Sequence, residues 1–355
     1  MIRYAELKRE GKMKAKELKN ALCIGGVLVL VLLFAFPSWS TAQAKKYKWR
    51  LSQVLPVDSD HDIRAKAFAK EVKERTQGRI DITVYSGGVL GDWVETTEMV
   101  MRGAVEMALD PVAPTYDQKL NITYYMPYVA ETMDKAKKIY SRDSFMYKLV
   151  NEIMEPLNMK GLAIYPVGSS GCTINKVPPS PGDPDVPKNI KMRVMPIKLC
   201  ELTWKRLGYL PTAIPWAEVY PALQTGVADG QMGGPPYQGY TVRDVQKCWI
   251  QYNDYFEIYW FYMNKKLWDG LSAGDKKILV EAAERQCEGR WKAIGEEDEK
   301  YRNEMKKAGL EIIMLSDKEL EKCAAAIRKD VWPEMEKIVG KALMDRIYTD
   351  LSIKR

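Results

Sequence analysis

The chain has a single histidine and lacks the known phosphate-binding motifs, and both facts limit the chemistry that it can perform. His61 is the only histidine among the 355 residues, so a Ser-His or Cys-His device would depend on that residue alone. It lies among Asp58, Asp60 and Asp62, where a helix is expected to begin, and we interpret it as a solvated residue of the helix cap. The segment lacks the glycine and distal glutamate of a calcium loop, and neither GxGxxG nor GxxxxGK(S/T) occurs. We predict no metal, no cofactor and no catalytic residue, although paired carboxylates leave no local pattern by which to recognise them.

Arg193 is the charged residue with the clearest chemical indication. It lies in the short apolar segment KMRVMP, where Met192 and Val194 should face the opposite side of a strand. An arginine at a strand end, near a helix N-terminus, can grip a carboxylate through two parallel hydrogen bonds. The alternative is an exposed arginine on an edge strand.

Aromatic residues gather where strands are expected to end. They are Trp93, Tyr124, Tyr125, Trp216, Tyr237 and Trp260. Core packing explains most aromatic residues, but Trp93 and Trp216 begin helices, so we predict that these two form walls of a ligand pocket. We also predict that Tyr237 binds the ligand, together with the polar residues Gln53 and Asp110 near the ends of two expected strands.

The five cysteines after residue 44 match no zinc-binding spacing. They are Cys172, Cys200, Cys248, Cys287 and Cys323. An odd number leaves at least one thiol unpaired. We expect them to be small buried side chains, with one disulfide between Cys172 and Cys200 as the alternative.

The elements that position these residues follow from hydrophobic periodicity. Strands are expected at 47–54, 79–85 and 104–109, with helices at 60–76 and 93–101 between them. Such an alternation predicts right-handed crossovers and a parallel sheet, and therefore an α/β fold.

Later segments continue the pattern. We expect one or two helices over 134–157 and strands at 160–167, 191–196, 256–264 and 311–315. A further strand is expected to start at Val227. A capping box at Ser272 and Asp275 begins a helix of up to ~35 residues, with a break at Gly289 or Gly295 as the alternative. A last helix over 318–340 should kink near Pro333.

Two segments resemble each other at an offset of 123 residues. Trp93 and Glu95 correspond to Trp216 and Glu218, Gly103 to Gly226, and Glu106 to Asp229. Chance similarity of two amphipathic helices is the alternative. If the repeat is real, two similar α/β lobes each present a helix N-terminus, which attracts anions, to a cleft at the strand ends.

The N-terminus predicts export. Residues 3–19 are basic, 21–36 are uncharged and apolar, and Ala42-Gln43-Ala44 has a cleavage pattern. We therefore predict a signal peptide over 1–44, removed after Ala44, and a periplasmic protein; a retained anchor is the alternative. These 44 residues carry seven basic and three acidic side chains, so the net charge falls from +7 to +3, and nothing indicates nucleic-acid binding.

Four segments resemble the solute-binding proteins of tripartite ATP-independent periplasmic (TRAP) transporters, of the dicarboxylate-binding type. They are FAKEVKERTQGRIDITVYSGGVLGD at 68–92, KNIKMRVMP at 188–196, LGYLPTAIPWAEVYPALQTGVADGQ at 207–231 and MNKKLWDGLSAGDKKILVEAA at 263–283. The resemblance implies a two-lobed, type II-like α/β fold with a long helix spanning both lobes. Lobe I would be 45–168, completed by 259–298, and lobe II 169–258, completed by 299–355. It also implies small and large membrane subunits as partners, a monomer or dimer, and Arg193 as the carboxylate-binding arginine.

Departures from the family pattern bear on the ligand. Many members carry a second arginine where Ser170 stands, and an asparagine where Gly233 follows Gln231. We predict that these three residues also contact the ligand. Polar contacts are thus lost, which predicts a monocarboxylate with an apolar or aromatic body instead of a C4-dicarboxylate or sialate; a second charged clamp elsewhere would overturn this. The alternatives to transport are a two-lobed enzyme and an anchored sensor or docking protein with the same fold.

Overall fold

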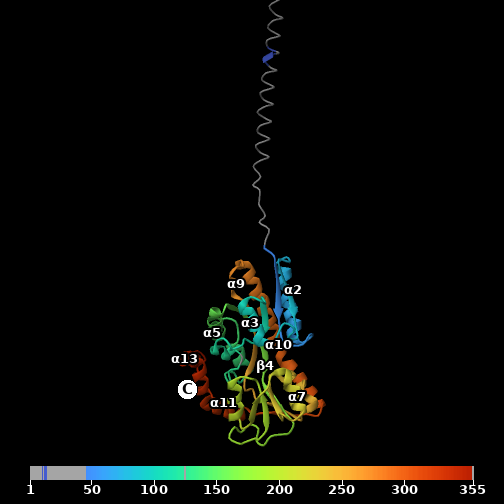
Figure 1. The fold of residues 1–355 in the computed structure, drawn as a ribbon, viewed down its shortest axis with the longest axis vertical. Coiled ribbons are helices and arrows are strands. Elements are labelled where there is room, and N and C mark those ends of the chain that lie inside the picture. The colour runs from blue at the N-terminus through green and yellow to red at the C-terminus, as the bar shows by residue number, and fades with distance from the viewer. Residues whose placement is uncertain (1–9, 11, 14–44, 124, 354–355) are drawn as a thin grey trace, which may run out of the picture. The chain divides into compact units, whose positions relative to one another are not determined.

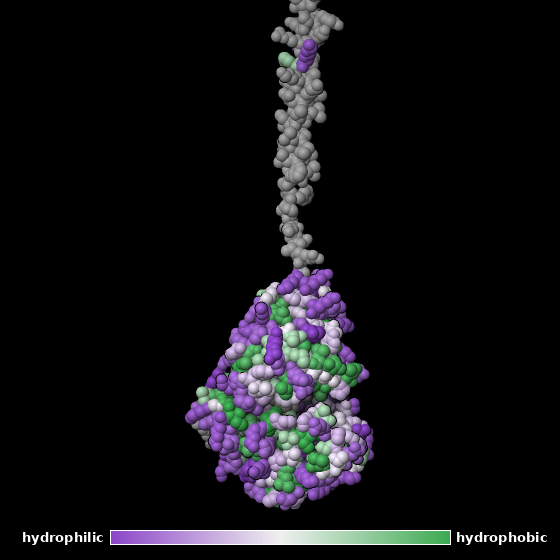
Figure 2. Space-filling model, viewed as in Figure 1, coloured by the Kyte–Doolittle hydropathy of each residue, from purple (hydrophilic) through white to green (hydrophobic). Residues whose placement is uncertain are grey.

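The computed structural model describes residues 10, 12–13, 45–123 and 125–353. Residues 1–45 and 46–355 form separate units, and the fold below is that of the second (Figure 1). The predicted signal peptide and its cleavage site lie outside the described residues, except for Glu10, Lys12 and Met13. Among the residues described, no helix is long and apolar enough to cross a membrane. The face seen in Figure 2 is mostly hydrophilic, with smaller apolar patches between.

The first sheet has five strands in the order β2-β1-β3-β10-β4. They are β1 (Tyr47–Ser52), β2 (Ile80–Tyr85), β3 (Met107–Asp110), β4 (Met159–Ser169) and β10 (Phe256–Asn264). The strand β1 is parallel to β2 and β3, as predicted, whereas β10 is antiparallel to β3 and β4. The third strand begins three residues later than predicted, because Ala104 N–H still donates to Met99 O of the preceding helix at 2.8 Å.

Helices connect these strands, and capping residues mark where several of the helices begin and end. They are α2 (Asp60–Arg75), α3 (Trp93–Arg102), η1 (Gln118–Thr123), α4 (Met133–Ile139), α5 (Phe145–Met154) and η2 (Glu155–Leu157). Ser59 caps α2, and Asp92 forms a capping box with Glu95 at the start of α3. Gly103 ends α3 at φ 75°, a conformation that favours glycine.

The second sheet has six strands in the order β11-β9-β5-β8-β6-β7. They are β5 (Gly171–Ile174), β6 (Lys191–Val194), β7 (Leu210–Ala213), β8 (Gly230–Gly233), β9 (Cys248–Gln251) and β11 (Glu311–Met314). The prediction that a strand starts at Val227 was wrong by three residues, because Ala228 N–H returns to Ala222 O at 3.1 Å. Strands β5 and β9 were not predicted, because four residues buried on both faces show no alternation.

Both sheets share one arrangement, which supports a repeat over chance similarity. In each, three parallel strands adjoin a single antiparallel strand, β10 in the first sheet and β5 in the second. From Met107 to Gly230 and from Asp110 to Gly233 the separation is 123 residues, so β8 repeats β3 at the offset read from the sequence. Gly226 matches Gly103, with the same φ of 75°.

The helices between β6 and residue 272 are short. They are α6 (Lys198–Arg206), η3 (Trp216–Glu218), α7 (Val219–Gln224), α8 (Pro236–Tyr240), η4 (Arg243–Val245) and α9 (Lys265–Asp269). Pro215 precedes η3, and the helix expected after Trp216 thus begins as a 3-10 turn before α7.

The long helix α10 (Ala273–Lys307) runs for 35 residues without a break at either glycine. Ser272 caps it by accepting from Asp275 N–H at 3.0 Å, while the Asp275 carboxylate pairs with Arg79 at 2.6 Å. Helix α10 packs against α2 and β4 of the first half and against α8 and β11 of the second. Figure 1 shows it between α2 and α9 at one end and α7 at the other, as expected of a helix that spans two lobes.

Three helices end the chain: α11 (Asp317–Asp330), α12 (Trp332–Val339) and α13 (Lys341–Asp350). The predicted kink near Pro333 is confirmed, since the helix breaks at Val331 and the proline lies in the first turn of α12. Trp332 Nε1 donates to Pro127 O at 2.9 Å, so this segment also holds part of the first half.

Two crossings between the sheets lie side by side. The chain passes from β4 to β5 at Ser170, and from β9 to β10 through 252–255. Ser170 Oγ donates to Asp254 Oδ1 at 2.6 Å, and Asn253 N–H donates to Ser170 O at 2.9 Å. The crossings are therefore tied to each other, which suits a hinge between two lobes.

Candidate ligand-binding site

Arg193 lies inside the second sheet. Its strand β6 pairs with β7 on one side and β8 on the other, and the side chain is 2% exposed. The alternative of an exposed edge-strand arginine is therefore wrong. Met192 and Val194 point to the opposite face and belong to the main apolar core, as predicted.

Main-chain oxygens and one aromatic ring hold the guanidinium of Arg193. Its Nε donates to Ile214 O at 2.8 Å and its Nη1 to Met232 O at 3.4 Å. Its Cζ lies 5.8 Å from the ring centroid of Trp216, within the range of a cation–π contact. Both acceptors are main-chain carbonyl oxygens, so these two hydrogen bonds orient the guanidinium group.

Gln231 and Gly233 on β8 complete this group. Gln231 is the register partner of Arg193, so the two side chains share one face of the sheet. A Cβ placed on Gly233 would lie 3.0 Å from Gln231 Nε2. The ring of Trp216 is 47% exposed beside them. The structure thus brings together four of the predicted residues, at the C-terminal ends of β6 and β8.

Gln53 and Asp110 lie at the corresponding edge of the first sheet, just after β1 and at the end of β3, while Trp93 begins α3. The Gln53 amide is satisfied locally, since Nε2 donates to Leu55 O and Oε1 accepts from Leu55 N–H, each at 2.8 Å. Asp110 Oδ1 accepts from Val54 N–H at 2.9 Å. Burial raises the pKa of Asp110 well above its usual value, which favours a neutral carboxyl at this edge.

Ser170 and Tyr237 are placed elsewhere. The hydroxyl of Ser170 donates to Asp254 and accepts from Tyr255 N–H at 3.0 Å, so it serves the hinge. Tyr237 lies in α8, where its hydroxyl accepts from Gln238 Nε2 at 3.2 Å. No described hydrogen bond links either side chain to Arg193, and their ligand contact remains a prediction.

His61 is buried, contrary to the interpretation of a solvated cap. Its ring is 2% exposed and lies 4.9 Å from the ring of Tyr165 and 5.0 Å from that of Tyr259. Burial, and then the charge of Arg290, lower the pKa of His61 to about 3. The cap itself is Ser59, so His61 falls on the inner face of α2. Among the described residues no group of three or more His, Cys, Asp and Glu is placed to hold a metal ion.

The cysteines after residue 44 are all buried free thiols. The alternative of a disulfide between Cys172 and Cys200 is therefore wrong. Both belong to the main apolar core, where burial raises the pKa of each thiol well above its usual value. They act as small apolar side chains, as the first interpretation held.

Two buried polar residues near the site were missed from sequence. Thr173 on β5 is the register partner of Gln231, and Glu257 on β10 accepts from Gln238 Nε2 at 2.7 Å. The single charge in the aromatic run FEIYWFYMN was a usable signal for Glu257, because an isolated acid inside a buried strand needs a partner. Thr173 gave no such signal, since threonine is common in strands.

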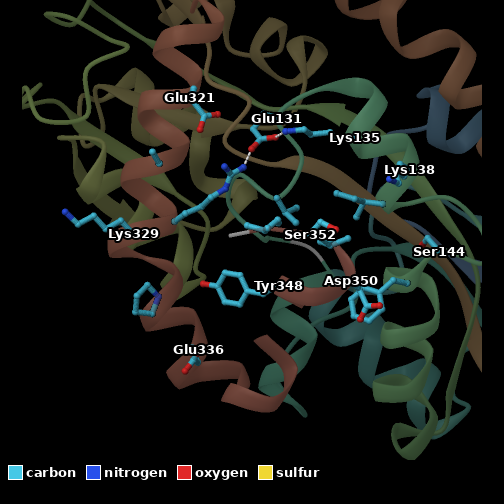
Figure 3. A pocket seen from close by; sticks show the side chains of 18 of the residues that line it. Glu131, Lys135, Lys138, Ser144, Glu321, Lys329, Glu336, Tyr348, Asp350 and Ser352 are labelled. Carbon is cyan, nitrogen blue, oxygen red and sulfur yellow. Dashed lines mark hydrogen bonds and ion pairs between the residues drawn. The ribbon is translucent and has the colours of Figure 1, made fainter. Parts of the chain in front are cut away.

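A separate pocket of about 1510 Å³ lies between α4, α5 and the three C-terminal helices. Figure 3 shows Glu131 and Lys135 at one side, Glu321 and Lys329 along α11, and Tyr348 near the centre. Glu131 pairs with Lys135 at 2.8 Å and also with Arg328. None of the site residues predicted from sequence lines this pocket.

Known proteins share this arrangement. Residues 51–337 match the model of the family described as bacterial extracellular solute-binding protein, family 7, DctP. The chain is 28% identical over 289 residues to the C4-dicarboxylate-binding periplasmic protein DctP of Rhodobacter capsulatus, covering 80% of this chain and 84% of that protein. It is 25% identical over 360 residues to the ectoine-binding periplasmic protein TeaA of Halomonas elongata, covering 96% and 97%. A solved TRAP periplasmic solute-binding protein from Chromohalobacter salexigens, with bound d-glucuronate, superposes with a TM-score of 0.77 at 22% identity, covering 86% of this chain and all of that one (100%).

These matches extend over both sheets and the long helix. The structural likeness confirms the predicted two-lobed α/β fold. The family consists of substrate-binding proteins of transporters and not of enzymes, and the two relatives named above are periplasmic proteins. The chain belongs to the family 7 extracellular solute-binding proteins, the DctP family that serves TRAP transporters.

Proposed function

We propose that this protein captures an organic acid in the periplasm by closing two lobes around it, and then delivers it to the small and large membrane subunits of a TRAP transporter. The observation that carries the proposal is Arg193, an arginine that is buried within a sheet yet held by main-chain oxygens. A ligand carboxylate can meet its guanidinium in a bidentate pair. Residues 45–168 with 259–298, and 169–258 with 299–355, are the proposed lobes.

The proposed ligand is a monocarboxylate with an apolar or aromatic body. Gly233 offers no side-chain hydrogen bond, and the hydroxyl of Ser170 is taken up by Asp254 and Tyr255. Trp216, half-exposed beside Arg193, offers a flat apolar wall. The competing classes are those in the names of related proteins, namely C4-dicarboxylates, ectoine and a sugar acid.

A thermal-shift screen of carboxylates tests this function. It should include aromatic and branched monocarboxylates, C4-dicarboxylates, glucuronate and ectoine. A ligand at 100 times its dissociation constant should stabilise the protein by ~2.7 kcal/mol. Stabilisation by dicarboxylates or glucuronate but not by the monocarboxylates would contradict the proposed ligand, and stabilisation by no carboxylate would contradict the function.

Export is the remaining part of the proposal. We infer cleavage after Ala44, from the pattern of residues 1–44. The mass of the protein purified from the periplasm should correspond to a chain starting at Lys45. An intact N-terminus in a membrane fraction would favour the anchored sensor instead.

A further inference from the structure

A row of polar side chains runs across the second sheet beside Arg193. Thr173 on β5 is paired with Gln231 on β8, and Gln231 is paired with Arg193 on β6. Register partners in adjacent strands project from the same face, about 5 Å apart. Three potential hydrogen-bonding groups, a hydroxyl, an amide and a guanidinium, therefore stand next to one another on one face.

The first two of these groups are buried without protein partners. Gln231 and Thr173 are 0% exposed. Among the residues that the structure describes, Gln231 Nε2, Gln231 Oε1 and Thr173 Oγ1 have no hydrogen-bond partner. Leaving a buried amide unpaired costs free energy, so a native protein that keeps one generally has a use for it.

Two other buried glutamines of the same half are bonded at both atoms of the amide. Gln238 Oε1 accepts from Gly234 N–H at 2.9 Å and its Nε2 donates to Glu257 at 2.7 Å. Gln251 Nε2 donates to Ser170 O at 2.9 Å and its Oε1 accepts from Trp249 Nε1 at 3.3 Å. Gln246 is bonded at one end, since its Nε2 donates to Val245 O at 2.8 Å while its Oε1 has no partner. Among the buried glutamines that the structure describes, Gln231 is the one whose amide lacks a partner at both atoms.

The Gln231 amide reaches toward the ligand end of the sheet. Its Nε2 lies 3.0 Å from the place that a Cβ of Gly233 would occupy, and Gly233 is the last residue of β8. Gly233 is not among the glycines with positive φ, so its backbone does not require glycine. The missing side chain instead leaves room for the amide at the C-terminal end of the strand, where ligands of α/β sheets bind.

We infer that Gln231, with Thr173 behind it, recognises an oxygen substituent on the carbon next to the ligand carboxylate. This rests on the proposed function, in which Arg193 holds that carboxylate. An amide both donates and accepts, so it can bond a hydroxyl or a keto oxygen. Gln231 lies on the strand next to that of Arg193. Its amide is therefore within reach of the ligand carbon that adjoins the carboxylate. The ligand class becomes a 2-hydroxy or 2-oxo monocarboxylate whose remaining body faces Trp216.

Matched acids test the inference by titration calorimetry. The pairs are lactate and propanoate, 2-hydroxy-4-methylpentanoate and 4-methylpentanoate, and 3-phenyllactate and 3-phenylpropanoate, with phenylpyruvate as the 2-oxo acid. The measured quantity is the ratio of dissociation constants within a pair, because it cancels the contribution of the body. In at least one pair the oxygenated acid should bind about 10- to 100-fold more tightly than its partner.

Two variants test whether the Gln231 amide is the cause of that ratio of dissociation constants. Gln231→Met keeps the length of the side chain without the amide and should bring the ratio close to one, while the deoxy acid still binds. Gln224→Met, at an exposed glutamine of α7, is the matched control and should leave the ratio unchanged. A thermal melt of each variant verifies that it folds.

The outcomes separate this inference from the function on which it rests. Equal binding of both members of every pair that binds, or a ratio that Gln231→Met leaves unchanged, would overturn the role of Gln231 and leave the carboxylate-binding function standing. Binding of none of these acids would instead contradict the monocarboxylate proposal itself.

Discussion

At the scale of single residues, the proposed site takes its charge and its apolar surface from different side chains. Arg193 supplies charge, and its orientation comes from Ile214 O and Met232 O. Trp216 supplies apolar surface, with its ring 5.8 Å from the guanidinium carbon. Because the ring is 47% exposed, its removal should affect the ligand more than the fold.

Trp216→Ala therefore tests the wall. An aromatic side chain contributes both apolar area and cation–π attraction, so its loss should weaken binding of an aromatic acid by about tenfold. The melting temperature without ligand should stay close to that of the wild type. Trp268→Ala, at a half-buried tryptophan of α9, is the control and should leave affinity unchanged; equal affinity in both variants would remove Trp216 from the site.

Asp254 carries a second residue-scale prediction, on pH. Burial raises its pKa to about 6, although it accepts from Ser170, Tyr125 and Trp204. The folded state then holds the proton more tightly than the unfolded state, whose pKa is ~3.9. The stability from this group is fully present below pH ~4 and is lost as the pH rises through about 6.

Asp254→Asn removes that titration. Between pH 4 and 7 the free energy of unfolding should fall less steeply in the variant than in the wild type, by up to about 3 kcal/mol. Urea denaturation at both pH values measures the difference. Glu284 and Asp298 also have raised pKa values, each about 7. Because these two groups are present in both proteins, the difference in slope between variant and wild type isolates the contribution of Asp254. The same slope in both proteins would show that Asp254 does not titrate in this range.

At the scale of elements, the sequence predicted the helices that have hydrophobic periodicity or an N-cap residue. Helix α2, the capping box of α3 and the long helix from Ser272 follow from side-chain spacing and N-cap residues. The short strands β5 and β9 did not, because their burial comes from neighbouring strands far away in the chain. The same limit applies to His61, whose burial depends on rings from β4 and β10.

The arrangement of the candidate site was predictable to a similar degree, while its contact with a ligand stays a prediction. Arg193 and Gln231 were indicated by the segment in which they lie, and β6 and β8 place them side by side. The engagement of Ser170 by Asp254 was not visible, since 84 residues separate the two. Likewise, no pattern in the sequence shows that the Gln231 amide lacks a partner, because satisfaction of hydrogen bonds is a tertiary property.

The continuity of α10 gives an element-scale prediction. A Cβ at Gly295 would meet no atom within 4 Å, whereas one at Gly289 would lie 2.6 Å from Arg64 Nη1. Gly295→Ala should stabilise the protein by about 0.5–1 kcal/mol, because alanine loses less backbone entropy in a helix. Gly289→Ala should gain less, since Arg64 must move. Destabilisation by Gly295→Ala in urea denaturation would indicate a break in the helix at that residue.

At the scale of the whole molecule, the proposed closure would turn on the two crossings between the sheets. They meet at Ser170 and Asp254, and α10 packs on both halves. Gly168, just before the first crossing, has φ 152°, and Asn253 in the second has φ 49°. Few residues need to change conformation for the lobes to close.

Closure predicts a change that scattering detects. The radius of gyration from small-angle X-ray scattering should fall when a saturating ligand is added, because two lobes close around it. Amide exchange at the ends of β6 and β8 should slow in the same samples. An unchanged radius with a ligand that binds would contradict closure.

The central claim is that Arg193 holds the carboxylate of the ligand. Titration calorimetry of the best acid from the screen, with wild type, Arg193→Lys and Arg193→Ala, tests it most directly. Lysine cannot form the bidentate pair, so Arg193→Lys should lose at least about tenfold in affinity and Arg193→Ala at least about 100-fold. Arg102→Ala, at an arginine paired on the surface with Glu98, should bind as the wild type does. Affinity of folded Arg193→Ala within about threefold of wild type would contradict the account.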